Sequence, residues 1–320
     1  MVAALIGPLM TNPPPSPAPP RRPALLARAN DSAWLLLALT ALFWAGNVPA
    51  ARLAVGEVSP MVIVVGRWAL AGALAYFFVR RATRSEWSAL VPHWPKLAAL
   101  GLTLAVSNVL LFTAAAHTTG VNLAILQGVT PALVIIGANV AFKAPIGLVT
   151  IVGLAVALAG VGLVATGGAP ERILDIRFNV GDLYQLAASV LYAVYALLLR
   201  NRPPGSAWAI FSLVSLASFV ASLPMLAWEI AAGDAVAPSW RGLLVLAYIA
   251  IFTSLLGQLF FMRSVELVGP SRAAVFHNLT PVLGALLSVL LLGESLALHH
   301  MAALALVLGG IYLCERWGKR

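Results

Sequence analysis

The sequence predicts an all-α integral membrane protein in which ten transmembrane helices form two inverted repeats of five. The mean hydropathy is +0.94, and 61% of the 320 residues are hydrophobic while only 10% are charged. This composition excludes a water-soluble domain. Two further observations define the arrangement, because the apolar residues fall into ten separate runs and motifs of the first half recur in the second half.

The apolar residues come in runs of roughly 18–24, enough for an α-helix to cross about 30 Å of hydrocarbon. The first five expected spans are Trp34–Leu53, Met61–Val79, Leu97–Ala116, Leu123–Phe142 and Ile146–Ala165, separated by AVGEVSP, RRATRSEWSALVPHWPK, HTTGVN and KAP. The last five are Leu183–Leu199, Ala207–Trp228, Leu243–Met262, Ala273–Leu292 and Met301–Leu313, separated by RNRPPGS, EIAAGDAVAPSWRG, RSVELVGPSR and GESLALHH. Each separator contains charged residues, Gly or Pro, which predicts a break between helices.

Basic residues are distributed unequally between the two sides of these spans. With the N-terminus placed in the cytoplasm, fifteen Lys and Arg residues lie on the cytoplasmic side, four lie outside, and Arg67 lies within a span. An excess of basic residues in cytoplasmic segments is typical of membrane proteins. We therefore expect both termini in the cytoplasm, an even number of spans, and a multi-pass location in the cell (inner) membrane.

The ends and the middle of the chain lie outside the expected spans. Residues 1–30 contain the Pro-rich segment TNPPPSPAPPRRP and are expected to form a disordered cytoplasmic tail, with Met10 as an alternative start of translation. Residues 167–180 are expected to form an extracytoplasmic linker, and residues 317–320 a basic cytoplasmic tail. The single cysteine, Cys314, excludes a disulfide framework.

The two halves of the chain share motifs at a nearly constant offset. The aligned pairs are Thr130-Pro131 with Thr280-Pro281 and Gln127 with His277 at an offset of 150 residues, and Trp44 with Tyr192 at an offset of 148. These matches predict repeats at residues 31–166 and 181–316, each with five spans. Because five is odd, the second repeat enters the membrane from the opposite side, and such inverted repeats are typical of secondary transporters.

The chain resembles the EamA branch of the drug/metabolite transporter superfamily from about Asp31 to Arg316. The segments that carry the resemblance are FWAGNVPAARLA in the first span, Arg67 in the second, the spans with Pro131 and Pro281, and LLLGESLALHHMAALALVLGGIYL near the end. The resemblance implies ten helices, a central substrate cavity between the repeats, and export of amino acids or other small metabolites. The first repeat departs from the family pattern, since it has Lys143-Ala144 where the family often repeats the pair Gly293-Glu294.

Two segments with a Thr-Pro pair are the expected walls of this cavity. A proline within a helix has no N–H for the carbonyl four residues earlier, so Pro131 frees the carbonyl of Gln127. Pro281 frees that of His277 in the same way. Inside a membrane, Thr hydroxyls, neighbouring helices or cavity water satisfy such a carbonyl. We expect Gln127, His277 and Asn278 to bind substrate and both prolines to act as gating hinges; the alternative is that the prolines only bend their helices for packing.

Amide and aromatic side chains in the first and sixth spans are further candidates for substrate binding. Asn47 lies near mid-depth in the first span, one turn after Trp44, and Tyr192 and Tyr195 occupy the repeat-related places in the sixth. Ring faces beside an amide suit a small solute with polar and apolar parts. The alternative is that Asn47 bonds across helices while the aromatic side chains face lipid.

Arg67 is the one basic residue expected inside a span, about 10 Å from its outer end at roughly 1.5 Å per residue. A charge at this depth is costly unless it meets an acid, backbone carbonyls or water. We expect Arg67 either to hold a substrate carboxylate or to have a structural role, in which it snorkels outward or braces neighbouring helices.

His277 is the candidate for proton coupling, because imidazole changes charge in the physiological pH range; a hydrogen-bonded structural role is the alternative. No Asp or Glu lies in the middle third of an expected span, and Glu294 is expected to tie down the loop before the last helix. His299 and His300 supply too few ligands for a metal site, and no phosphate-binding motif is present. We expect no cofactor, metal or nucleic acid. The expected partners are a small-molecule substrate and the lipid bilayer, and a monomer is a candidate for the oligomeric state.

The favoured interpretation is a secondary active exporter of small metabolites, amino acids or related compounds, that works by alternating access and is not an enzyme. A broad exporter of lipophilic drugs or lipid-linked sugars is the main alternative, although export of lipophilic cations favours a buried acid that the spans lack. A membrane enzyme acting on lipids is less favoured, because it needs clustered His, Asp or Glu near one interface. A channel or receptor is disfavoured, because inverted repeats provide two interchangeable states rather than a permanent pore.

Overall fold

The computed structural model describes residues 32–143, 147–166, 168–169, 179–200, 203, 205–268 and 279–317. Every regular element in these ranges is a helix, which confirms the all-α class. In chain order the helices are α2 (Ala33–Ala45), α3 (Asn47–Leu53), α4 (Pro60–Leu90), η1 (Val91–His93), α5 (Trp94–Ala115), α6 (Gly120–Gln127), α7 (Thr130–Phe142), α8 (Leu148–Ala165), α9 (Val180–Arg200), α10 (Ala207–Ala232), α11 (Trp240–Tyr248), η3 (Ile249–Leu256), α12 (Gly257–Val268), α14 (Leu279–Leu292) and α15 (Leu298–Trp317).

Seven helical segments in the described residues are long and apolar enough to cross a membrane. They are Ala33–Leu53, Pro60–Phe77, Glu86–Ala115, Gly120–Ala141, Val180–Leu199, Trp208–Ala232 and Trp240–Phe261. Three shorter apolar helices accompany them, at Leu148–Val164, Leu279–Leu292 and Leu298–Leu313. The chain is therefore a multi-pass membrane protein, while the count of ten crossings remains a prediction.

Several expectations concern residues outside the described ranges. They are the Pro-rich tail at residues 1–30, most of the linker at residues 167–180, the last three residues of the basic tail, and the candidate site residues His277 and Asn278. The part of the second Thr-Pro segment that the structure describes begins at Leu279, the first residue of α14.

Three of the crossing segments are interrupted near their middle. The first is divided at Gly46, where a Cβ would lie only 1.9 Å from the hydroxyl oxygen of Tyr248. In the second, α6 ends at Gln127 and α7 begins at Thr130, directly before Pro131. The third contains the π-helix η3 between α11 and α12. Interrupted helices in the middle of a membrane leave backbone groups available, and transporters place binding sites at such breaks.

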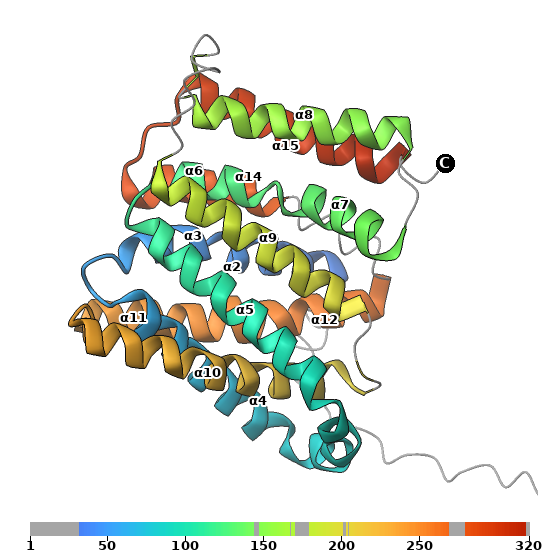
Figure 1. Cartoon of the computed structure of the whole chain (residues 1–320), viewed down its shortest axis with the longest axis vertical. Helices are drawn as coiled ribbons and strands as arrows, with labels where there is room; N and C mark the ends of the chain where they lie inside the picture. The colour runs from blue at the N-terminus through green and yellow to red at the C-terminus, as the bar shows by residue number, and fades with distance from the viewer. Residues whose placement is uncertain are drawn as a thin grey trace, which may run out of the picture.

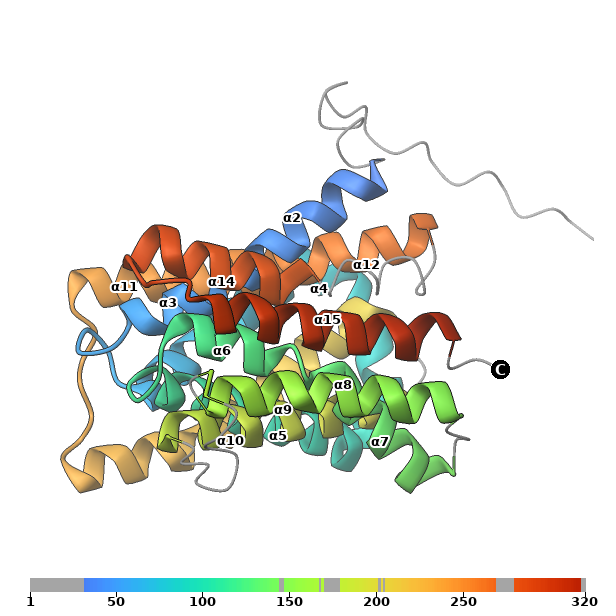
Figure 2. The same ribbon diagram turned by 90° about the horizontal axis from the view of Figure 1, so that it is seen from above.

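Helices of the first half pack mainly against helices of the second half. α8 lies beside α15, α4 beside α10, and α6 beside α14 (Figure 1). In addition, α5 packs on α9 and α2 packs on α12, while α7 contacts α9 and α2 contacts α14. α2 begins and α15 ends at the same end of the bundle, on the right of Figure 2. The centre of the bundle is therefore an interface between the two halves.

Candidate functional site

A cavity of about 120 Å³ lies at this interface, beside all three interrupted segments. The two halves of the chain contribute equally to it, with ten lining residues each. The lining combines polar side chains with several aromatic rings, and among the described residues it contains no Asp or Glu. By the same measure of volume, about 10–15 Å³ is enough for one water molecule. This one has room for a small solute.

The structure brings together every candidate binding residue that it describes. Six of the eight expected residues line the cavity, namely Trp44, Asn47, Arg67, Gln127, Tyr192 and Tyr195. Pro131 and Pro281 are not part of the lining, but each directly follows a threonine that is, Thr130 and Thr280. Each proline lies in the first turn of its helix, α7 or α14. A hinge at these positions would act on the cavity wall without touching a bound solute.

Arg67 is buried in α4 with 8% of its surface exposed. Its Nε donates a hydrogen bond of 2.7 Å to Ser254 Oγ in η3, and its Nη1 donates one of 2.6 Å to Asn108 Oδ1 in α5. The side chain thus braces three helices, and the expectation that it snorkels to the membrane surface is wrong. Bracing does not exhaust its bonding capacity, because a guanidinium has five N–H donors and these bonds use two.

The partners of Arg67 are themselves held in place. Asn108 Nδ2 donates to the carbonyl of Leu104 at 2.6 Å, and Ser254 Oγ lies 3.0 Å from the carbonyl of Ile249, five residues earlier. The five-residue step is that of a π-helix, whose wider turn rotates the following side chains relative to an α-helix. The irregular segment η3 therefore fixes the place of Ser254 beside Arg67.

Four polar atoms of the cavity lining are buried and have no hydrogen-bond partner among the described residues. They are Asn47 Oδ1, Gln185 Oε1, Thr280 Oγ1 and Trp68 Nε1. Leaving such an atom unpaired costs about 1–3 kcal/mol. Four of them around one cavity, together with a cation, indicate a place that a polar solute or water occupies.

Aromatic side chains supply the apolar part of the cavity. The rings of Tyr192 and Tyr195 on α9 are 5.6 Å apart between centroids. Trp44 Nε1 donates to the carbonyl of Thr253 in η3 at 3.0 Å, which fixes the indole in the wall. The neighbouring Phe43 packs against Phe252. Of the two aromatic side chains before Asn47, Trp44 is therefore the one that faces the cavity.

The interruption between α6 and α7 satisfies the carbonyl that Pro131 leaves free. Thr130 Oγ1 donates a hydrogen bond of 2.7 Å to the carbonyl of Gln127. This carbonyl is the one that residue 131 would bond in a regular helix. The Thr-Pro pair thus produces a stable break rather than a strained kink, and it places both Gln127 and Thr130 in the cavity wall.

Sequence patterns missed seven polar residues of the cavity, namely Ser107, Asn108, Gln185, Ser189, Thr253, Ser254 and Gln258. Asn108 and Gln258 both line it, and they are related by the same 150-residue offset as the Thr-Pro pairs, so an alignment of the two halves could have found them. Gln185 lies in the first half of α9 and carries no comparable signal. The position of Ser254 depends on a π-helix, which no sequence period predicts.

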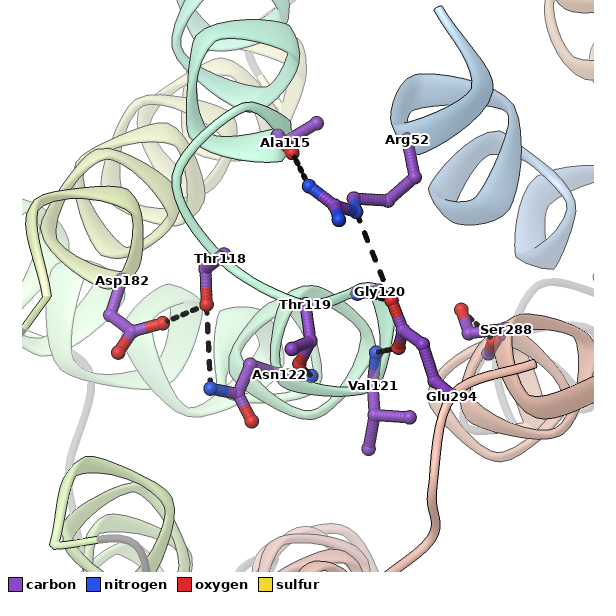
Figure 3. A network of polar contacts seen from close by, with 11 residues as sticks. Arg52, Ala115, Thr118, Thr119, Gly120, Val121, Asn122, Asp182, Ser288 and Glu294 are labelled. Atoms are coloured by element: carbon purple, nitrogen blue, oxygen red, sulfur yellow. Dashed lines mark hydrogen bonds and ion pairs between the residues drawn. The ribbon is translucent and has the colours of Figure 1, made fainter. Parts of the chain in front are cut away.

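A second polar cluster closes one end of the bundle (Figure 3). Glu294, which follows α14, accepts hydrogen bonds from the backbone N–H groups of Gly120 at 2.8 Å and Val121 at 2.9 Å. Arg52 lies 3.8 Å from the same carboxylate and also donates to the carbonyl of Ala115. We call this cluster the end network. Glu294 therefore ties the loop between α14 and α15 to α6 of the first half, a partner that the sequence did not identify.

Asp182 extends the end network to α9. Its Oδ1 accepts a hydrogen bond of 2.7 Å from Thr118, and Asn122 donates to the same threonine at 3.3 Å. Gly120 and Gln127 are the first and last residues of α6, so the end network lies about 10 Å from the cavity at roughly 1.5 Å per residue. The cavity has a polar lining, and charged and polar contacts join the two halves at this end of the bundle.

Comparison with known proteins gives consistent similarities. The family model of the EamA-like transporter family matches residues 31–166 and again residues 179–315. The chain is 24% identical to the uncharacterized transporter YyaM of Bacillus subtilis over 87% of this chain and 92% of YyaM. It is 26% identical to an uncharacterized transporter of Archaeoglobus fulgidus over 88% of this chain and 98% of that protein. A solved crystal structure shares its fold, with a TM-score of 0.60 and 19% identity over 90% of this chain and 98% of the other.

Proposed function

Because the chain belongs to the EamA-like transporter family of the drug/metabolite transporter superfamily, we propose that it is a secondary active transporter that exports small metabolites, amino acids or related compounds, by alternating access. The observation that carries this proposal is the cavity between the two halves, to which each half contributes ten lining residues. Its unpaired polar atoms and its aromatic rings suit a small solute that has both polar and apolar parts.

The contacts between the halves support an inverted repeat of five helices plus five. A two-fold relation requires that a contact of the third span with the sixth is accompanied by one of the eighth with the first. The corresponding pairs are α5 with α9 and α12 with α2, and both occur. The contact of α7 with α9 has its counterpart in that of α14 with α2. Seven long and three shorter apolar helices supply the ten spans of this proposal.

Alternating access requires that the cavity opens to one side of the membrane at a time. The end network is suited to one of the two closures, since Glu294 of the second half bonds to Gly120 and Val121 of the first half. Opening that end would also require the bonds of Asp182 with Thr118 and of Glu229 with Ser59 to break, because they join the same two halves. The interrupted segments beside the cavity provide the places where the helices bend.

The remaining parts of the proposal concern location and assembly. The basic residues favour cytoplasmic termini in the cell (inner) membrane. α2 begins and α15 ends at the same end of the bundle, as an even number of crossings requires (Figure 2). A single chain supplies the cavity, so we propose a monomer as the working unit. The proposed role is transport without chemical change of the solute.

Counterflow in proteoliposomes tests the proposal directly. The vesicles are loaded with unlabelled aromatic, aliphatic or hydroxy amino acids, and uptake of the labelled compound is followed with and without an imposed pH gradient. We expect saturable exchange for at least one class. A response to the gradient would support proton coupling, for which His277 remains the proposed residue.

A pair of variants distinguishes cavity transport from leakage. Asn47→Ala combined with Gln185→Ala removes two amides of the cavity and should lower exchange strongly. Thr103→Ala on α5 is the matched control, because its hydroxyl bonds only to backbone carbonyls of its own helix. Equal exchange by both variants and the wild type would contradict transport through this cavity. Exchange of lipophilic drugs alone would favour the broad-exporter alternative.

A further inference from the structure

Among the described residues, the charge of Arg67 in the central cavity has no counter-ion, and this defines the solute. We propose that Arg67, held by Asn108 and Ser254, is a carboxylate-binding subsite, so that the transported solute must carry a carboxylate group. The inference rests on the proposed transport function and makes it more specific. It names the chemical group that is recognised, whether or not the solute also carries an amino group.

Burial of the Arg67 charge is the first argument. The side chain is 8% exposed within a membrane-spanning helix, where an isolated charge costs several kcal/mol or more. Its two hydrogen-bond partners, an amide and a hydroxyl, are neutral. The two ion pairs among the described residues are Arg52 with Glu294 and Arg241 with Glu57, both at helix ends. Within the ranges that the structure describes, no acid faces Arg67.

The free donors of Arg67 give the second argument. Nε and Nη1 are engaged, and the other three N–H donors of the guanidinium bond to none of the described residues, so they are open to a ligand. A carboxylate is the group that the planar fork of arginine binds with two parallel hydrogen bonds of about 2.7–2.9 Å. The bonds to Asn108 and Ser254 hold the guanidinium in position before a solute arrives, which lowers the ordering cost of binding.

The rest of the lining supports a solute of mixed character. The unpaired Asn47 Oδ1 and Gln185 Oε1 accept hydrogen bonds, so they match a donor group on the solute, such as an ammonium or a hydroxyl. Tyr192 and Tyr195 offer ring faces to its apolar part. A cavity of about 120 Å³ limits that part to a small group. A lipophilic cation fits poorly, because it would face Arg67 and the described lining contains no acid to neutralise it.

Matched probes isolate the carboxylate. The compounds are leucine, leucinamide, isoamylamine and isocaproate, with the corresponding phenylalanine series, tested as competitors and as counterflow substrates of the full-length protein in proteoliposomes. We expect exchange of compounds that carry the carboxylate and a preference of at least about tenfold over the amide and the amine. Equal exchange of leucine and leucinamide, or exchange of the amines alone, would overturn the subsite while leaving the transport function intact.

Two variants of the subsite separate carboxylate binding from bracing. Arg67→Gln keeps a polar brace but removes the charge. Asn108→Asp keeps Arg67 and places a carboxylate beside Nη1, where it competes with the carboxylate of the solute. The substitution removes the side-chain donor to the Leu104 carbonyl, but this carbonyl keeps its backbone hydrogen bond within α5. Both should reduce the acid-over-amide preference by about tenfold. Arg241→Gln is the matched control, an exposed arginine at the end of the bundle, and should keep the wild-type preference.

The outcomes separate the two levels of the proposal. If Arg67→Gln fails to fold, Asn108→Asp decides, since it leaves every helix contact of Arg67 in place. If both variants retain the wild-type preference for acids over amides, Arg67 only braces the helices and the subsite is wrong. If folded wild-type protein exchanges none of the probes, both the carboxylate subsite and the proposed transport of amino acids or related compounds are wrong.

Discussion

Glu294 Oε1 lies 2.8 Å from the backbone nitrogen of Gly120, so the second half of the chain caps a helix of the first half. The other carboxylate oxygen bonds to Val121, and a carboxylate at a helix N-terminus is also favoured by the helix dipole. This one side chain therefore joins the two halves through two backbone hydrogen bonds, next to the bond between Thr118 and Asp182 (Figure 3).

Substitution of Glu294 should weaken that attachment. We expect Glu294→Ala to lower the free energy of unfolding in detergent by about 1–3 kcal/mol, because two backbone donors lose their acceptor. Glu294→Gln should have a smaller effect, since its single carbonyl oxygen still accepts one of the bonds. Denaturant titration of the purified variants measures both. An alanine variant as stable as the wild type would show that water replaces the carboxylate at no cost.

The same substitution should open the route from the end network to the cavity. A cysteine at Leu111, which lines the cavity on α5, reports access after the native Cys314 is replaced by serine. We expect the rate of maleimide labelling at this cysteine to rise at least several-fold with Glu294→Ala, because loss of the caps frees α6. Thr103→Ala in the same background is the control, because its hydroxyl bonds only to carbonyls of α5. An unchanged rate would mean that other contacts keep this end closed.

The Thr-Pro pair of the first half makes a prediction that a double-mutant cycle can test. Thr130→Val should destabilise the protein by about 1–3 kcal/mol, since the Gln127 carbonyl loses its donor. Pro131→Ala restores a backbone N–H at the position that reaches this carbonyl. The double variant should therefore be less destabilised than Thr130→Val alone, with a coupling of about 0.5–3 kcal/mol. Additive effects would mean that the break between α6 and α7 persists without proline.

The Thr-Pro pair also shows how far sequence reasoning reaches. A proline frees the carbonyl four residues earlier, and this rule identified the carbonyl of Gln127. The hydrogen-bond donor to this carbonyl proved to be Thr130, the residue directly before Pro131. Apolar runs located the helices, because membrane thickness fixes their length. The repeat offset of 148 residues paired Trp44 with Tyr192, and the structure places both side chains in the lining of one cavity.

Other features depend on three-dimensional packing and left no pattern in the sequence. The π-helix at Ile249–Leu256 has the same apolar composition as a regular helix, so its wider turn and the resulting position of Ser254 were not predictable. The partner of Glu294 was also not identified, because nothing in the sequence indicates that residues 120 and 294 lie together. The structure instead places α6 beside α14, which makes a distant helix N-terminus available to it.

The helix ends after α7 and α14 share one backbone conformation although only the second has the Gly-Glu pair, and they predict opposite stability changes. Lys143 has φ of +53° where the second half has Gly293 with φ of +68°. Both therefore adopt the left-handed conformation, which costs a residue with a Cβ about 1–2 kcal/mol. We expect Lys143→Gly to stabilise the protein by roughly 0.5–1 kcal/mol after the greater chain entropy of glycine is subtracted. Thermal unfolding in detergent measures the change.

Gly293→Ala is the reciprocal test of the same conformation. No heavy atom lies within 4 Å of a Cβ at this position, so steric contact does not contribute. We expect a loss of about 1–2 kcal/mol from the backbone alone. Stabilisation by both substitutions, or by neither, would show that the left-handed ends are not what limits stability there.

The close contact at Gly46 predicts a rescue between two helices of opposite halves. A Cβ at residue 46 would lie 1.9 Å from Tyr248 Oη, so Gly46→Ala should destabilise the protein by about 3 kcal/mol as α2 and α11 are forced apart. Tyr248→Phe removes that oxygen, and its own cost is small because its hydrogen bond to the Phe43 carbonyl is long, at 3.4 Å. In the double variant the nearest ring carbon is 3.0 Å from the new methyl group, so we expect recovery of about half of the loss. Thermal unfolding of the wild type, the two single variants and the double variant gives the coupling energy between residues 46 and 248. A double variant that is no more stable than Gly46→Ala would show that the destabilisation comes from the bend of the first span rather than from this contact.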